Sequence, residues 1–158
     1  MTMLDHKIEL LQQVPLFSGL SEDLLSAIAD AGHKTFFEAG ENLITEEEAG
    51  SAAYLIMTGK AGCSRVEGGE TLIEDLWPGT LVGELGMLVE TVHNVTVTAQ
   101  ERLRALAFHR DAFRTVMEAH PELAQHIAEK LLVRLHGLAA EIRTVDEKLA
   151  QLELEEAA

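Results

Sequence analysis

Between residues 34 and 108 the chain is divided into short runs of β-branched and apolar residues, and this pattern restricts the fold more than any other feature. The runs are separated by turn residues such as Ala39-Gly40, Gly68-Gly69 and Pro78-Gly79. Short strands joined by tight turns are typical of antiparallel sandwiches and barrels, and not of a parallel sheet with helical crossovers. The two adjacent glycines predict a β-hairpin turn.

Helical periodicity flanks the strand-rich region on both sides. Weak helical spacing precedes Pro15, and the run after Ser21 predicts a helix over about residues 22 to 31 with a serine N-cap. After Phe108 the helical spacing returns, and Pro121 stands where a new helix is expected to begin. The sequence therefore predicts a mainly β fold with flanking helices.

The last predicted helix has an apolar stripe with heptad spacing. Its apolar residues are separated alternately by four and three positions: Leu131, Leu135, Leu138, Ile142, Val145, Leu149 and Leu152. This spacing predicts a coiled-coil seam and hence a homodimer. The alternative is a monomeric helix that packs back onto the strands. The flanking charges favour neither orientation of a dimer.

The net charge of the chain indicates which partners to expect. The chain has 12 Lys and Arg residues against 27 Asp and Glu, a formal net charge of −15. Because phosphate backbones repel such a surface, DNA is not expected as a partner. The single cysteine, Cys63, excludes an intramolecular disulfide and suits a reducing compartment. With no membrane-length apolar run and no signal-peptide pattern at the start, we expect a soluble cytoplasmic protein without a membrane partner.

One stretch interrupts the succession of strands and carries the candidate chemistry. Residues 82–89 are helix-like and Gly83 opens the helical part, so free backbone N–H groups there suit an anion. Glu84 is placed to accept hydrogen bonds from a hydroxyl-bearing ligand. No triad, carboxylate pair, phosphate loop or metal-ligand spacing is found, so we expect neither an enzyme nor a metal site, and no cofactor.

These motifs resemble the cyclic nucleotide-binding domain of the catabolite-activator and protein-kinase regulatory families. The resemblance runs in order from about Val14 to Leu135, through PLFSGLS, YLIMTGK, WPGTLVGELGML, VTVTA and HPELAQHIAEKLLVRL. It implies a β-roll, a jelly-roll-like double-stranded β-helix, of about eight strands plus a long C-terminal helix. We expect residues 1–120 to form the roll with its N-terminal helices and a short following helix, and residues 121–158 to form the dimerisation helix.

The resemblance also assigns ligand-binding residues. The family's phosphate-binding cassette begins Gly-Glu-Leu-Ala, which Gly83, Glu84 and Leu85 match and where Gly86 takes the small-residue place. This implies that Gly83 lies near a cyclic phosphate and that Glu84 holds a ribose hydroxyl. His93 and Asn94 stand where the family has Arg and Ser or Thr.

Two departures from the family pattern weaken the expected binding. His93 replaces the arginine that clamps the phosphate, and losing one partner of a desolvated charge pair costs roughly 2–5 kcal/mol. Relatives of the catabolite activator meet adenine with hydroxyl residues on the long helix, where this chain has Leu138 and Ala139. The sequence has 27 residues after Leu131, the start of the seam, too few for that family's helix-turn-helix domain, which again predicts no DNA partner.

Two functional hypotheses follow. In the first, the chain is a regulatory domain that weakly senses a cyclic nucleotide (cyclic AMP or cyclic GMP) or another small anion and signals through its C-terminal helix. In the second, the pocket has lost its ligand and the chain is a dimeric protein-interaction module. The intact Gly83-Glu84-Leu85 opening favours the first, and the missing arginine and hydroxyl groups favour the second.

Overall fold

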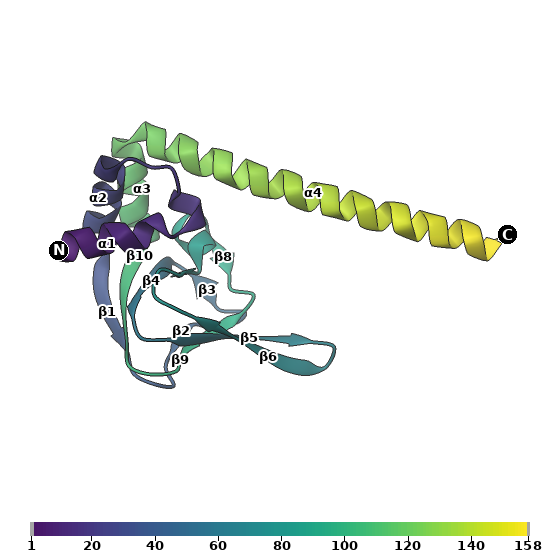
Figure 1. Cartoon of the computed structure of the whole chain (residues 1–158), viewed down its shortest axis with the longest axis horizontal. Helices are drawn as coiled ribbons and strands as arrows, with labels where there is room; N and C mark the ends of the chain where they lie inside the picture. The colour runs from purple at the N-terminus through teal and green to yellow at the C-terminus, as the bar shows by residue number, and fades with distance from the viewer. Residues whose placement is uncertain (1, 158) are drawn as a thin grey trace.

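A computed structural model describes residues 2–157 of the chain (Figure 1). Three helical segments come first: α1 (Met3–Gln12), a 3-10 turn η1 (Pro15–Phe17) and α2 (Glu22–Ala31). The structure confirms the helix predicted after Ser21, whose side chain accepts a hydrogen bond from the backbone N–H of Leu24. Such a cap satisfies one of the free N–H groups at the start of a helix.

Ten strands follow and form antiparallel pairs. They are β1 (His33–Phe37), β2 (Asn42–Ile44), β3 (Ala49–Gly50), β4 (Ala52–Thr58), β5 (Ala61–Glu67), β6 (Glu70–Leu76), β7 (Leu81–Val82), β8 (Thr91–Val92), β9 (Thr96–Ala99) and β10 (Leu103–His109). One sheet has the order β1-β10-β4-β7, a second the order β2-β9-β5-β6, and β3 pairs with β8 alone. The structure has more strands than the eight expected. Three of the ten, β3, β7 and β8, have only two residues each and are too short to show alternation in a sequence.

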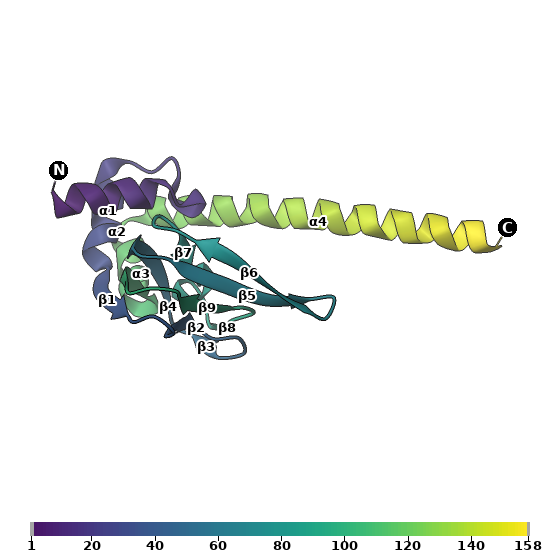
Figure 2. The same ribbon diagram turned by 60° about the horizontal axis from the view of Figure 1, so that its bottom comes forward.

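The hairpin predicted at Gly68-Gly69 joins β5 to β6 and is confirmed. Both glycines have positive φ, 58° and 81°, as the tight turns that match strand twist require. The hairpin extends from the roll on the same side as the C-terminal helix (Figures 1 and 2).

The core has two parts, one on each side of the sheet β1-β10-β4-β7. Inside the roll, Ile56, Val97 and Leu103 lie among the fully or nearly buried residues. On the outer face, Leu55 and Phe108 pack beneath the helices in a second cluster. Burial of side chains of this size stabilises by roughly 1.5–3 kcal/mol each, which fixes the helices against the sheet.

Two helices end the chain. The first, α3 (Arg110–Ala119), follows β10 directly, and α4 (Pro121–Ala157) begins at the predicted proline. Leu123 and Ile127 of α4 are buried in the outer core cluster. Farther along, the helix leaves the roll and projects from it (Figure 2). Residues 1 and 158, the outer ends of the two predicted segments, lie outside the described residues.

The predicted seam lies on the projecting part of α4. Leu131 is partly buried against the outer core cluster, but the other six seam residues are each between 51% and 62% exposed in the single chain. Within residues 2–157, none of the helices is both long and apolar enough to cross a membrane.

Candidate ligand-binding site

A cavity of about 520 Å³ opens beside η2, a 3-10 helix of four residues (Glu84–Met87), between β7 and β8. Its lining includes all six predicted ligand-binding residues: Gly83, Glu84, Leu85, Gly86, His93 and Asn94. The structure thus brings residues 83–86 and residues 93–94 to one cavity. That these residues contact a ligand stays a prediction. The helix expected over residues 82–89 is shorter than predicted, so its dipole contributes less to anion binding than expected.

Gly83 begins η2 in the left-handed conformation, with a φ of 73°. Residues with a Cβ rarely adopt this conformation, so the position favours glycine. A Cβ here would also lie 3.4 Å from both the His93 ring and the Ile44 side chain. The glycine that the cassette pattern singled out is therefore required by the local backbone as well.

His93 follows β8, and its backbone is fixed by two hydrogen bonds. Its N–H donates to the carbonyl of Glu48 at 2.9 Å, and its carbonyl accepts from the N–H of Glu47 at 2.8 Å. A Cβ on Gly50 would lie 2.7 Å from Cε1 of the His93 ring. The imidazole therefore fills the space that two glycines, Gly50 and Gly83, leave open at the base of the cavity.

Arg110, at the start of α3, joins the two backbone segments behind the cavity. Its Nε donates to the carbonyl of Gly86 at 3.0 Å, and its Nη2 donates to the carbonyl of Gly50. Arg110 falls in the HRDAF run of the resemblance, but sequence reasoning assigned it no role. Its partners are backbone carbonyls 24 and 60 positions away, which adjacent residues do not indicate.

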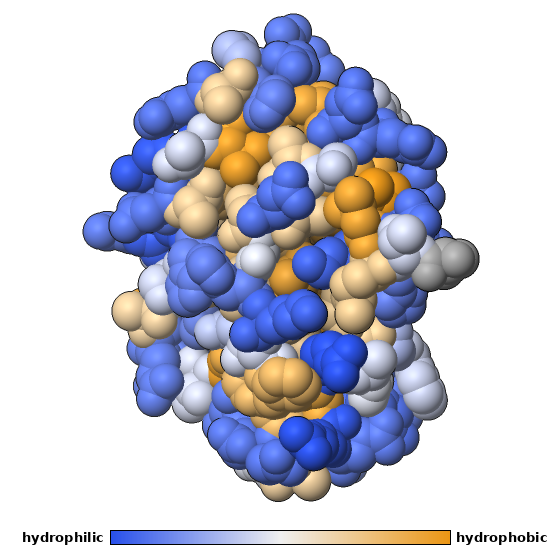
Figure 3. Space-filling view, turned by 90° about the vertical axis from the view of Figure 1, so that its left-hand side faces the viewer, coloured by the Kyte–Doolittle hydropathy of each residue, from blue (hydrophilic) through white to orange (hydrophobic). Residues whose placement is uncertain are grey.

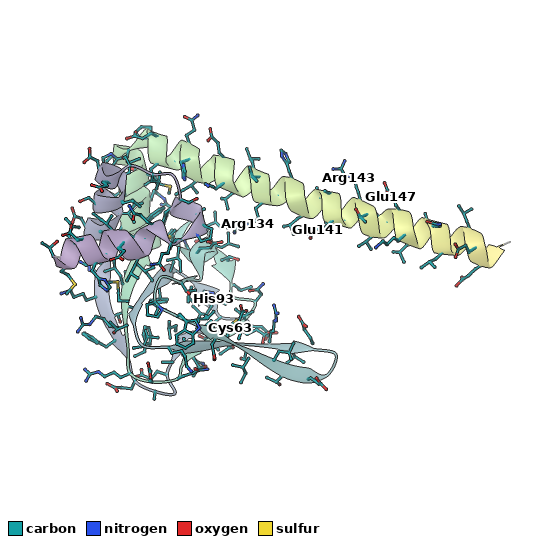
Figure 4. All side chains as sticks on the ribbon, in the orientation of Figure 1. Cys63, His93, Arg134, Glu141, Arg143 and Glu147 are labelled. Atoms are coloured by element: carbon teal, nitrogen blue, oxygen red, sulfur yellow. The ribbon has the colours of Figure 1, made fainter. Side chains whose placement is uncertain are left out.

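Glu84 forms an ion pair with Arg134 of α4, and Arg134 also lines the cavity. Figure 4 shows Arg134 on the part of α4 nearest the roll, with Arg143 and Glu147 farther along the helix. The carboxylate expected to hold a ribose hydroxyl is thus already engaged by a guanidinium. Sequence reasoning missed this pair because the partners lie 50 residues apart.

Arg134 is the one Lys or Arg side chain in the described lining of the cavity. Apolar residues such as Ile44, Leu81 and Val95 make up much of the remainder. Within residues 2–157, no three His, Cys, Asp or Glu side chains are placed to share a metal ion. The arrangement suits a small organic ligand with hydroxyl groups and an apolar face better than a highly charged one.

A family model described as the cyclic nucleotide-binding domain matches residues 34–120. The chain belongs to this family. That segment contains η2, β8 and the loop to β9, which line the cavity described above.

Two of the named relatives of this cyclic nucleotide-binding domain are regulatory proteins. A cAMP-dependent protein kinase regulatory subunit of Schizosaccharomyces pombe is 34% identical over 108 residues, which is 68% of this chain and 26% of that protein. A CRP-like cAMP-activated global transcriptional regulator of Mycobacterium tuberculosis is 26% identical over 146 residues, 91% of this chain and 62% of that protein. The chain thus spans about a quarter of the kinase regulatory subunit and less than two thirds of the transcriptional regulator.

Solved structures confirm the β-roll. The N-terminal domain of a transcriptional regulator from Streptomyces coelicolor superposes with a TM-score of 0.76 at 21% identity, covering 84% of this chain and 94% of that one. The Thermus thermophilus catabolite activator protein gives a TM-score of 0.69 at 26% identity, covering 84% of this chain and 63% of that one. The predicted fold class is therefore confirmed.

The prediction that DNA is excluded as a partner is wrong. The Mycobacterium tuberculosis relative is a transcriptional regulator and matches 91% of this chain, so a domain of this kind does occur in proteins that control transcription. The argument from net charge failed because the charge of one domain says nothing about surfaces elsewhere in a protein. The argument from length failed because the chain spans 62% of that relative.

Proposed function

We propose that this chain is a non-catalytic regulatory domain that senses a cyclic nucleotide weakly, or a related small anionic ligand, and signals through α4. The cavity beside η2 is the proposed binding site, with Glu84 meeting a hydroxyl group and the backbone at Gly83 and Gly86 facing the anionic part. Cyclic AMP is the first ligand to test, because the names of two relatives refer to it. Cyclic GMP is the second.

The observation that carries this proposal is the ion pair between Glu84 and Arg134. It joins the proposed ligand-contacting carboxylate to the helix that leaves the roll. A ligand hydroxyl that takes over Glu84 would compete with Arg134, and the docking of α4 would change with occupancy. The side chains are 24% and 45% exposed, so the pair contributes little stability of its own and is easily exchanged.

Weak binding follows from the charge at the base of the cavity. His93 stands where an arginine would meet a phosphate, and an imidazole has a shorter reach than a guanidinium. Arginine offers a fixed charge and two parallel donors to a phosphate, and histidine offers neither. The part of the cavity next to His93 therefore favours ligands whose negative charge is small or delocalised.

The seam on α4 supports a homodimer as part of the same proposal. Six apolar side chains at heptad spacing are more than half exposed in the single chain, and a second copy of α4 would cover them. We propose a parallel or near-parallel pair, in which residues from 121 onward act as the dimerisation segment.

A second candidate function is favoured by the position of the His93 ring. Because the imidazole fills the space beside Gly50 and Gly83, the site for a phosphate is partly occupied by the protein itself. In this candidate the domain binds no nucleotide and acts as a dimeric protein-interaction module.

Calorimetry with cyclic AMP, cyclic GMP and cyclic di-GMP distinguishes the two candidates. The sensing proposal predicts measurable binding of one of these ligands that is weakened by Glu84→Gln. It also predicts faster hydrogen exchange in the turns of α4 around Arg134 when ligand is bound, because Arg134 loses its partner. Arg143→Gln, on the exposed part of the same helix, is the matched control and should leave binding unchanged.

A variant expected to bind the ligand more tightly also tests the sensing proposal. His93→Arg should strengthen cyclic AMP binding about tenfold or more, since a charge-assisted hydrogen bond contributes roughly 1.5–3 kcal/mol. Absence of binding in both the native chain and this variant would contradict the sensing proposal and support the interaction module.

A further inference from the structure

The outer face of the sheet β1-β10-β4-β7 is covered by helices at one end only. There Leu106 and Phe108 of β10 are buried in the outer core cluster. Toward the other end, Phe36 of β1 is 50% exposed and lies opposite Arg104 of β10. Figure 3 shows this side of the molecule, with an orange surface near its lower end bordered by the most hydrophilic residues of the scale.

Two arginines stack on the exposed ring. The guanidinium carbons of Arg102 and Arg104 lie 5.6 and 5.5 Å from the centroid of Phe36. Both distances are within the range of a cation–π interaction, which holds a guanidinium in place without using its hydrogen-bond donors. Lys34 lies two positions before Phe36 in β1 and hence on the same face of the strand. We call these four residues the arginine–phenylalanine patch.

The patch surrounds a hollow and has unused donors. A cavity of about 330 Å³ is lined by Phe36, Thr58, Arg102, Leu103 and Arg104. Arg102 has a carboxylate neighbour, Glu38, with 3.7 Å between Nε and Oε1. Among residues 2–157, Arg104 has no carboxylate within 4.0 Å, and its buried Nε has no hydrogen-bond partner. Its guanidinium is therefore positioned by the ring and free to bind an acceptor.

The local charge is opposite to that of the whole chain. Three of the 12 basic residues gather around one exposed aromatic ring, in a chain whose formal net charge is −15. A guanidinium binds a carboxylate with two parallel hydrogen bonds, and these are stronger than hydrogen bonds between neutral groups. An aromatic ring beside an arginine is also the composition typical of residues that dominate binding at protein interfaces.

We propose that the arginine–phenylalanine patch is a docking surface for a polypeptide segment of a partner protein, one that presents a carboxylate next to an apolar side chain. The carboxylate binds Arg104 and Arg102, and the apolar side chain covers Phe36. None of the patch residues lines the cavity beside η2, so this surface is distinct from the proposed ligand site.

A single-stranded nucleic acid would use similar chemistry, because bases stack on aromatic rings and phosphates bind arginine. Such strands are usually held along a continuous basic groove. The patch is instead one hollow with Glu38 at its edge, a shape that matches a single side-chain carboxylate better than a run of phosphates.

Selection from a library of random short peptides displayed on phage tests the proposal, with the full chain immobilised. We expect enrichment of peptides with Asp or Glu adjacent to an aromatic or aliphatic residue. The most enriched peptide is then synthesised, labelled and titrated by fluorescence anisotropy. Arg104→Gln and Phe36→Thr should each weaken its binding about tenfold or more, because each removes one half of the site.

Arg143→Gln on α4 removes the same charge outside the patch and should leave peptide binding unchanged. Arg102→Gln, at a side chain that is 71% exposed, gives a second patch variant with little risk to folding. The proposal is overturned if no acidic peptide is enriched or if the patch variants bind the enriched peptide as the native chain does. It is also overturned if a labelled poly-thymidine oligonucleotide binds through these residues more tightly than the peptide.

Discussion

At the scale of single residues, the packing of the His93 imidazole against Gly50 and Gly83 limits the space in the cavity beside η2. The His93 ring occupies the space where Gly50 and Gly83 lack side chains, and a Cβ at Gly50 would come within 2.7 Å of it. The sequence singled out His93 because it stands where the family pattern has an arginine. The sequence did not show that Gly50 packs against it, since the contact requires the pairing of β3 with β8.

Gly50→Ala should force the His93 ring out of this space. We expect a loss of about 1–3 kcal/mol in the free energy of unfolding, the usual cost of overpacking, measured by urea denaturation. In a His93→Ala background the same substitution should cost much less, because the obstructing ring is gone. Equal costs in the two backgrounds would show that the ring and Gly50 do not compete for space.

Cys63 should react slowly with alkylating reagents. It lies in β5 opposite Glu74 of β6, and burial together with that carboxylate raises the pKa of its thiol, with Arg65 acting in the opposite direction. A raised pKa lowers the fraction of thiolate, the reactive form, so the rate at neutral pH is reduced and recovers as the pH rises above the usual thiol pKa.

Iodoacetamide kinetics followed by mass spectrometry measure this rate. Glu74→Gln should speed the reaction several-fold at neutral pH because it removes the negative charge opposite the thiol. Glu70→Gln, in the same strand but opposite Glu67, is the control and should have no effect. The same acceleration in both variants would assign the change to general loosening of the hairpin.

At the scale of secondary-structure elements, periodicity and capping signals predicted the helix after Ser21, the hairpin at Gly68-Gly69 and the start of α4 at Pro121. These features depend on residues close together in the chain. The ion pair of Glu84 with Arg134 could not be predicted in the same way, because it depends on how α4 docks on the roll.

Gly137→Ala should stabilise α4. Gly137 lies inside the helix, and a Cβ there would meet nothing within 4 Å in the single chain. Glycine inside a helix costs roughly 0.5–1 kcal/mol relative to alanine, so the substitution should slow hydrogen exchange in the surrounding turns by a corresponding factor. Destabilisation instead would indicate that the backbone at Gly137 approaches another helix closely, as in a dimer of α4.

At the scale of the whole molecule, the exposed seam of α4 leads to the prediction of a dimer. Leu138→Lys combined with Ile142→Lys should raise the dissociation constant by more than about a hundredfold, since each buried apolar side chain contributes roughly 1.5–3 kcal/mol. Sedimentation at micromolar concentration measures the change. Val133→Lys, at a residue that is 72% exposed and outside the seam, is the control. A native chain that sediments as a monomer would rule out the seam.

The length of α4 has a mechanical consequence. At 1.5 Å per residue, the part beyond Leu131 is about 40 Å long and rigid along its axis. A tilt of about 10° at its base therefore displaces the far end by about 7 Å, more than the width of a side chain. If ligand binding shifts the Glu84–Arg134 contact as proposed, that shift is geometrically amplified at the far end of α4.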